Sequence, residues 1–186
     1  MTRLSNASTS MLGSSEGLVF VPCGVDAGPP PRDVRRRREV VFDGRRVKTV
    51  DIHAHCAVPA ALALMGEKLA GPGLRTDLDM ATALDVRLAT MDAQGIDIEA
   101  LSINPNWYRV TERDRAAKII EIQNEALAEA CAKTPDRFVA FASVALQFPD
   151  LAAEQLAMGV AKYGLRGAAI GGNGAGAELS DPKFHP

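Results

Sequence analysis

The stretch that decides the fold is Thr49-Val50-Asp51-Ile52-His53-Ala54-His55. Its apolar residues alternate with Asp51, His53 and His55, and this period of two predicts a β-strand that carries the three polar side chains on one face. Two imidazoles on one strand face, about 6–7 Å apart along the strand, can bind one divalent ion. Imidazole suits zinc and similar transition metals. Asp51 would lie further into the barrel than the two histidines. From there it could accept a hydrogen bond from one of them and fix the orientation of that ring.

The alternative is that His53 and His55 are only polar residues at the point where a strand meets solvent. Three observations favour the metal site. The motif ends the first strand of an alternating strand–helix series, apolar residues flank its polar positions, and the sequence holds 3 histidines in all.

Strands and helices alternate along the chain after this motif. Apolar runs predict four strands, and helical patterns separate them; the strands are expected at about 47–53, 98–103, 137–144 and 165–170, and the helices at 58–70, 79–94, 111–134 and 151–163. A strand-first alternation with long connections predicts an α/β fold with a parallel sheet. Four such units are half of a (β/α)8 TIM barrel, which takes about 250 residues. An open half barrel leaves two unpaired edges, so we expect either a fragment or a sheet that a partner closes.

The predicted domain spans residues 39–186 and begins with a short hairpin. Val40–Phe42 and the strand from Val47 flank Asp43-Gly44, a strong hairpin signal. Residues 1–38 are rich in Ser, Gly and Pro and end in four arginines, and we predict a flexible leader here. They do not form a secretion signal, because their apolar run precedes the arginines whereas a signal has the opposite order.

The composition excludes several classes of partner. A net charge of −2 gives no electrostatic basis for binding nucleic acid or an anionic membrane. No stretch approaches the roughly 20 apolar residues that cross a bilayer. The 3 cysteines are widely spaced and odd in number, which argues against a disulfide framework and favours a reducing, cytoplasmic setting. Cys56 follows the histidine motif without a paired base, so we predict a structural role for it.

A group of polar and aromatic residues follows the second predicted strand. Asn104, Trp107 and Tyr108 come directly after it, on the face where barrel enzymes bind substrates. We predict that they line a substrate pocket with the aromatic rings against a planar molecule; the alternative is that the rings only pack the loop. Arg109 either pairs with a substrate carboxylate or is a solvated surface residue. The glycine-rich loop 171–174 is expected at the rim of the same site.

These motifs resemble those of the amidohydrolase superfamily, and more specifically its amidohydrolase-related branch, which includes aminocarboxymuconate-semialdehyde decarboxylase. The resemblance covers residue 47 to the end. It rests on the first-strand motif together with four segments in order, at 91–97, 123–127, 135–139 and 164–171.

The resemblance implies a TIM barrel, a bound zinc ion (manganese in some members) and His53 and His55 as metal ligands. It implies non-oxidative loss of CO2 from a small unsaturated or aromatic carboxylic acid, and a homo-oligomer for a complete protein. Other relatives hydrolyse C–C, ester or lactone bonds. Further histidines and an aspartate of the family follow on later strands, so the catalytic residues are expected downstream of Pro186. Three hypotheses for the function follow: the protein is a metal-dependent carboxy-lyase, a metal-dependent hydrolase, or a catalytically inactive truncated half barrel.

Overall fold

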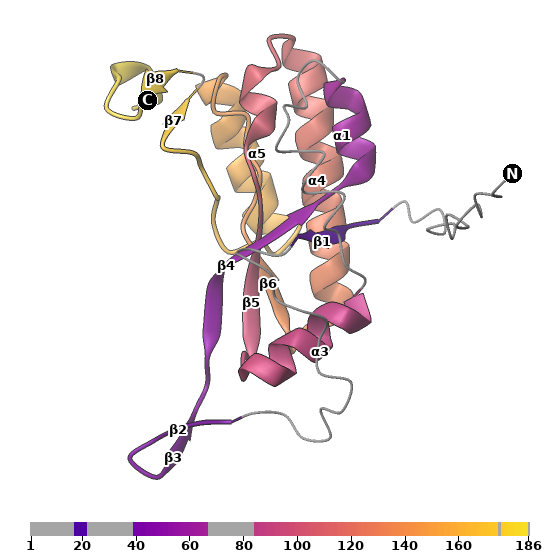
Figure 1. The fold of residues 1–186 in the computed structure, drawn as a ribbon. Coiled ribbons are helices and arrows are strands. Elements are labelled where there is room, and N and C mark those ends of the chain that lie inside the picture. Colours follow the sequence, from indigo (N-terminus) through magenta and orange to yellow (C-terminus); the bar gives the residue numbers. More distant parts are fainter. Residues whose placement is uncertain (1–16, 22–38, 67–83, 175, 186) are drawn as a thin grey trace, which may run out of the picture.

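The fold is known from a computed structural model that describes residues 17–21, 39–66, 84–174 and 176–185. Its main sheet has four strands in the order β1-β4-β5-β6, and Figure 1 shows the helices gathered mostly on one side of it. The strands are β1 (Val19–Val21), β4 (Val50–Ala57), β5 (Ile98–Ile103) and β6 (Phe138–Ala140), and the helices are α1 (Pro59–Met65), α3 (Leu84–Gln94), α4 (Arg113–Lys133) and α5 (Pro149–Ala161). Two short 3-10 helices cover Asn106–Arg109 and Pro182–Phe184.

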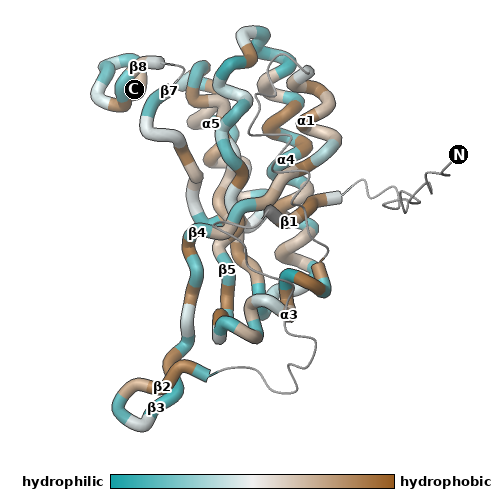
Figure 2. The backbone as a smooth tube through the Cα atoms, viewed as in Figure 1, coloured by the Kyte–Doolittle hydropathy of each residue, from teal (hydrophilic) through white to brown (hydrophobic). Residues whose placement is uncertain are grey.

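The three strands β4, β5 and β6 are parallel neighbours, as the strand–helix alternation predicts. β4 pairs with β5 from Val50 opposite Ile98 to Cys56 opposite Ile103. β5 is buried almost throughout, and its apolar side chains form the core with α1 and α4. In Figure 2 hydrophobic and hydrophilic colours alternate along β4, whose first half is largely exposed and whose second half is largely buried.

The fourth predicted strand is present only as a single bridge. Ala168 pairs with Ala142 in parallel, and the amide of Arg166 donates to the carbonyl of Ala140 at 2.8 Å. Gly167 has φ 135°, which takes the backbone out of the extended range and prevents a continuous strand. The predicted range 165–170 therefore runs beside β6 without being a regular strand, and the predicted range 137–144 is shortened to β6.

The predicted hairpin is confirmed, with different bounds for its second strand. β2 (Val40–Phe42) pairs with β3 (Arg45–Val47), and Asp43 and Gly44 both have positive φ, at 48° and 73°. This is the backbone that a two-residue hairpin turn requires. The predicted strand 47–53 divides at Thr49, whose amide donates to the carboxylate of Asp97 at 2.7 Å; β4 then begins at Val50.

A strand that the sequence did not predict lies inside the leader. β1 pairs antiparallel with β4, with Phe20 opposite Cys56. The Phe20 side chain is buried, and its ring stacks on that of Phe138 with centroids 5.3 Å apart. Pairing with β4 and burial of Phe20 make residues 19–21 a strand, so they differ from the predicted flexible leader. Residues 1–16 and 22–38 lie outside the described part of the chain.

Glycines follow two of the helices. Gly95 and Gly164 come after α3 and α5 with φ 79° and 67°, the left-handed backbone that favours glycine after a helix. The helix predicted from residue 111 begins at Arg113, and no side chain caps it. The predicted helical residues 67–70 and 79–83 lie outside the described residues. Two C-terminal strands, β7 (Asn173–Gly174) and β8 (Ala177–Glu178), form a small hairpin where only a loop was predicted.

No helix among the described residues has the length and apolar character that a membrane span needs.

One ion pair lies inside the fold, between α3 and β5. The guanidinium of Arg87 donates to the carboxylate of Glu99 at 2.8 Å, and Glu99 is 2% exposed. Burial raises the pKa of Glu99, and Arg87 beside it acts in the opposite direction. The pair fixes α3 against the sheet, because each charge depends on the other to remain buried.

Removing one member of this pair is expected to destabilise the protein more than removing both. R87M or E99L should each lower the free energy of unfolding by about 3–5 kcal/mol, and the double variant R87M/E99L by less than either. In R87M the burial of Glu99 raises its pKa without Arg87 to oppose the shift, so the loss should shrink as the pH is lowered and the carboxyl is protonated. Urea denaturation followed by circular dichroism measures these differences. R113M, which breaks the exposed pair with Asp150, is the control and should change stability by less than about 1 kcal/mol.

Candidate metal centre

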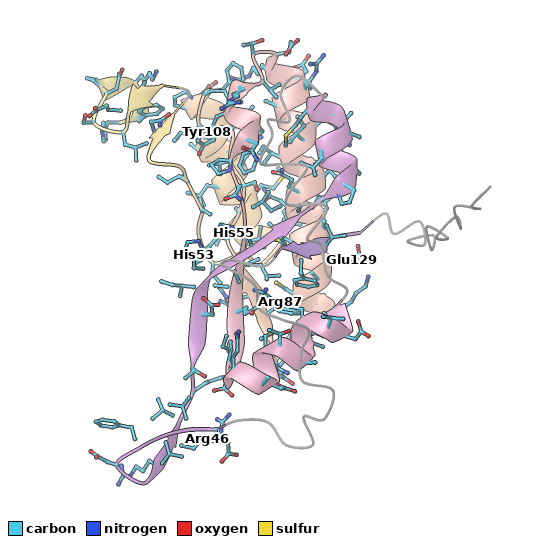
Figure 3. All side chains as sticks on the ribbon, viewed as in Figure 1. Arg46, His53, His55, Arg87, Tyr108 and Glu129 are labelled. Carbon is cyan, nitrogen blue, oxygen red and sulfur yellow. The ribbon has the colours of Figure 1, made fainter. Side chains whose placement is uncertain are left out.

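The two predicted metal ligands converge on each other. The Nε2 atoms of His53 and His55 lie 2.9 Å apart, and the two rings are nearly perpendicular at 85°. Figure 3 shows the pair near the middle of the molecule on β4, where His53 is exposed and His55 half-buried. The structure thus brings both residues together, as the sequence predicted.

The distance between the two nitrogens is suited to binding one cation. Two nitrogens about 2.1 Å from a metal lie about 3.0 Å apart when the angle between them is about 90°, and about 3.4 Å apart in a tetrahedron. The observed 2.9 Å is also the length of an N–H···N hydrogen bond, so one proton can join the rings when no metal does. The residues present therefore fit a divalent ion held through both Nε2 atoms.

A local irregularity of β4 sets the direction of these side chains. The register with β5 shifts between Asp51 and Ala54, and the Asp51 carboxylate accepts a hydrogen bond from the backbone amide of His53 at 2.9 Å. Such a bulge re-aims the side chains that follow it. Asp51 therefore holds His53 through the backbone and not through the imidazole ring, which differs from the predicted orienting role.

Ser102 is a site residue that the sequence did not reveal. It lies opposite His55 in the parallel pairing of β4 with β5, and its Oγ lies 3.3 Å from His55 Nδ1. Ligating histidines usually place their second ring nitrogen on such a partner, which fixes the tautomer and the ring direction. The only signal in the sequence was the position of Ser102 next to the end of the predicted strand 98–103.

Cys56 has the structural role that was predicted. Its thiol is buried and donates to the carbonyl of Ser102 at 3.4 Å. Burial raises the pKa of the Cys56 thiol well above its usual range, so the reactive thiolate does not form.

The described residues contain no group of three or more His, Cys, Asp or Glu side chains that could hold a metal ion. A catalytic zinc site usually has at least three protein ligands, so the histidine pair is part of a site. His185 lies elsewhere, with its Nε2 bonded to the carbonyl of Leu179 at 3.1 Å.

The three predicted substrate-binding residues differ in their surroundings. Asn104 is half-buried directly after β5. Trp107 is fully buried, and its indole N–H donates to the carbonyl of Val144 at 2.8 Å, so its ring packs the loop. Tyr108 is 7% exposed and lines a hollow of about 490 Å3. In Figure 3 Tyr108 lies above the histidine pair, on the segment that follows β5.

The chain belongs to the amidohydrolase family, whose model matches residues 50–185. It is 41% identical over 129 residues to a gamma-resorcylate decarboxylase of Rhodococcus jostii (strain RHA1), which covers 66% of this chain and 38% of the relative. A second gamma-resorcylate decarboxylase, from Rhizobium sp. (strain MTP-10005), is 46% identical over 89 residues, or 47% of this chain and 27% of the relative. The chain thus spans about two-fifths or less of the length of these relatives.

Solved structures show the same relationship. A 2,6-dihydroxybenzoate decarboxylase in complex with 2,6-dihydroxybenzoate superimposes with a TM-score of 0.58 and 32% identity, over 74% of this chain and 44% of that structure. A dihydroxybenzoic acid decarboxylase of Polaromonas sp. JS666, with bound manganese and the inhibitor 2-nitroresorcinol, gives a TM-score of 0.52 and 30% identity, over 65% and 37%. These neighbours confirm the TIM-barrel fold class, and this chain covers part of that fold.

The hydrogen bond of Ser102 should matter for metal affinity. S102A removes the partner of His55 Nδ1 and is expected to weaken Mn2+ and Zn2+ binding by about 10–100-fold. S102T keeps the hydroxyl and should restore most of the affinity. Isothermal titration calorimetry measures both, with the exposed S180A as the control. Equal affinity in S102A and S180A would mean that Ser102 does not position the ligand.

Proposed function

We propose that this protein is a metal-dependent decarboxylase that removes CO2 from a hydroxylated benzoic acid. The observation that carries the proposal is the distance of 2.9 Å between the Nε2 atoms of His53 and His55, on β4 of an amidohydrolase fold. The relatives at 41% and 46% identity, both named gamma-resorcylate decarboxylases, support this reaction over hydrolysis.

His53 and His55 would hold the divalent ion, each through Nε2. Binding a cation there requires each ring to carry its proton on Nδ1. Ser102 supports this state at His55, because its Oγ can accept a hydrogen bond from Nδ1–H. Asp51 fixes the backbone of His53 and so limits the movement of the second ligand.

The choice between zinc and manganese is part of the proposal. The sequence resemblance favoured zinc, whereas the solved neighbour from Polaromonas contains manganese. Imidazole ligands bind either ion, so the manganese of this solved neighbour is what supports the choice. We therefore propose manganese as the better candidate. When bound, the ion supplies positive charge that polarises and orients the substrate carboxylate.

The substrate would lie across the carboxyl ends of the strands. Asn104 follows β5 directly and can donate or accept a hydrogen bond to a substrate hydroxyl or carboxylate. The ring of Tyr108 would line the substrate pocket at a greater distance from the two histidines. Trp107 is buried and bonded to the carbonyl of Val144, so it would support the loop without contacting substrate. No described residue is assigned here as the acid that protonates the ring carbon as CO2 leaves.

A product assay tests the proposal. Incubated with Mn2+ and 2,6-dihydroxybenzoate, the protein should release CO2 and form resorcinol in equal amounts. H53A and H55A should each reduce the rate by at least about 100-fold, because the ion loses one of its ligands. H185A is the matched control and should leave the rate unchanged, since His185 bonds only a nearby carbonyl.

Two outcomes would contradict the proposal. Hydrolysis of an ester or lactone substrate without CO2 release from the acid would favour the metal-dependent hydrolase. Stoichiometric metal binding without turnover of any such acid would favour a catalytically inactive half barrel.

A further inference from the structure

A row of three side chains crosses the parallel strands at the level of the histidine pair. Figure 1 shows β4, β5 and β6 side by side, and His55 on β4 lies opposite Ser102 on β5. Phe141 comes directly after β6, and its amide donates to the carbonyl of Leu101 at 3.0 Å, which continues the pairing of β5 with β6 by one residue. The row therefore runs from His55 through Ser102 to Phe141.

The burial of the flanking residues shows which face this row occupies. Each member of the row stands between two residues of the hydrophobic core, and successive side chains of a strand point to opposite faces. The row therefore points away from the helices, on the face that carries the candidate metal centre. The flanking core residues are Ala54 and Cys56 on β4, Leu101 and Ile103 on β5, and Ala140 and Ala142 at the end of β6.

The row is polar at one end and apolar at the other. The imidazole of His55 and the hydroxyl of Ser102 form the polar end, and the phenyl ring of Phe141 forms the apolar end. Neighbouring strands lie about 4.8 Å apart, so the backbone of Phe141 lies about 10 Å from that of His55. A benzoic acid held by its carboxylate at the histidine pair would extend across Ser102 and bring the far edge of its ring toward Phe141.

The surroundings of Phe141 fix its position. A Cβ atom on Gly167 would lie 3.9 Å from Cδ1 of Phe141, so this half-buried ring lies against the backbone of the neighbouring segment. On the helix side, the Asn124 amide accepts a hydrogen bond from the backbone amide of Ser143 at 2.8 Å and donates to its carbonyl at 3.0 Å. These bonds hold the backbone just after Phe141, so the ring forms a rigid apolar surface.

We propose that Phe141 is a specificity-determining residue, whose ring contacts the edge of the substrate opposite the carboxylate. The inference rests on the proposed function, because it takes a hydroxylated benzoic acid bound by its carboxylate at the histidine pair. A phenyl ring accepts no conventional hydrogen bond, so a hydroxyl at position 4 of the substrate would lose water there and gain no partner. Hydroxyls at positions 2 and 6 lie at the other end of the substrate and do not reach Phe141. The site therefore selects acids whose hydroxyls flank the carboxylate.

Two acids that differ only in a hydroxyl at position 4 test this inference. We expect the Mn2+-loaded chain to bind 2-hydroxybenzoate roughly tenfold or more tightly than 2,4-dihydroxybenzoate in a calorimetric titration, because the additional hydroxyl is buried without a partner. F141N offers that hydroxyl a hydrogen bond and should bring the two affinities within about threefold of each other. F141L keeps an apolar contact and should retain the preference.

F148N is the matched control for F141N. Phe148 is also half-buried, but it packs against the hydrophobic core and lies under the guanidinium of Arg113, outside the row. F148N should therefore leave the ratio of the two affinities unchanged, whatever it does to stability. The same ratio in F141N and in the unaltered chain would overturn the inference. An equal change in F148N, or failure of both acids to bind, would also overturn it.

The release of CO2 from the two acids separates this inference from the proposed function. CO2 release with the same ratio of kcat/KM values in F141N and in the unaltered chain would support decarboxylation and refute the role of Phe141. A preference in binding that depends on Phe141, without CO2 release from either acid or from 2,6-dihydroxybenzoate, would support the role of Phe141 and refute decarboxylation.

Discussion

The parallel pairing of β4 with β5 determines both the core and the candidate metal site. It places Ser102 opposite His55, so that the second nitrogen of this imidazole has a partner. The register of the two strands shifts between Asp51 and Ala54, the segment that holds His53. The Nε2 atoms of His53 and His55 lie 2.9 Å apart.

The described strands carry the histidine pair together with the residues that support it. The histidine pair, its serine partner and the buried pair Arg87–Glu99 all depend on β4, β5 and the helix that precedes β5. The chain spans 38% of one decarboxylase and 44% of a related structure, so it covers part of the family barrel.

The sequence predicted those features that depend on local pattern. The strand that carries His53 and His55 and the Asp43-Gly44 turn follow from local signals, and the structure contains both of them. The contribution of Ser102 depends on pairing between strands distant in the sequence. β1 was missed because its short apolar run needs Phe138 and β4 as partners, and Trp107 was placed in a pocket because sequence does not reveal its bond to Val144.

The central claim is that His53 and His55 bind one divalent ion through their Nε2 atoms. Long-range 1H–15N correlation spectra of the histidine side chains during a Zn2+ titration test this claim most directly, because Zn2+ is diamagnetic and the spectra identify the ligating nitrogen. The Nε2 signals of both residues should shift together and stop shifting at one equivalent, while the signals of His185 stay unchanged. A shift of only one member of the pair, or an equal shift of His185, would contradict the account.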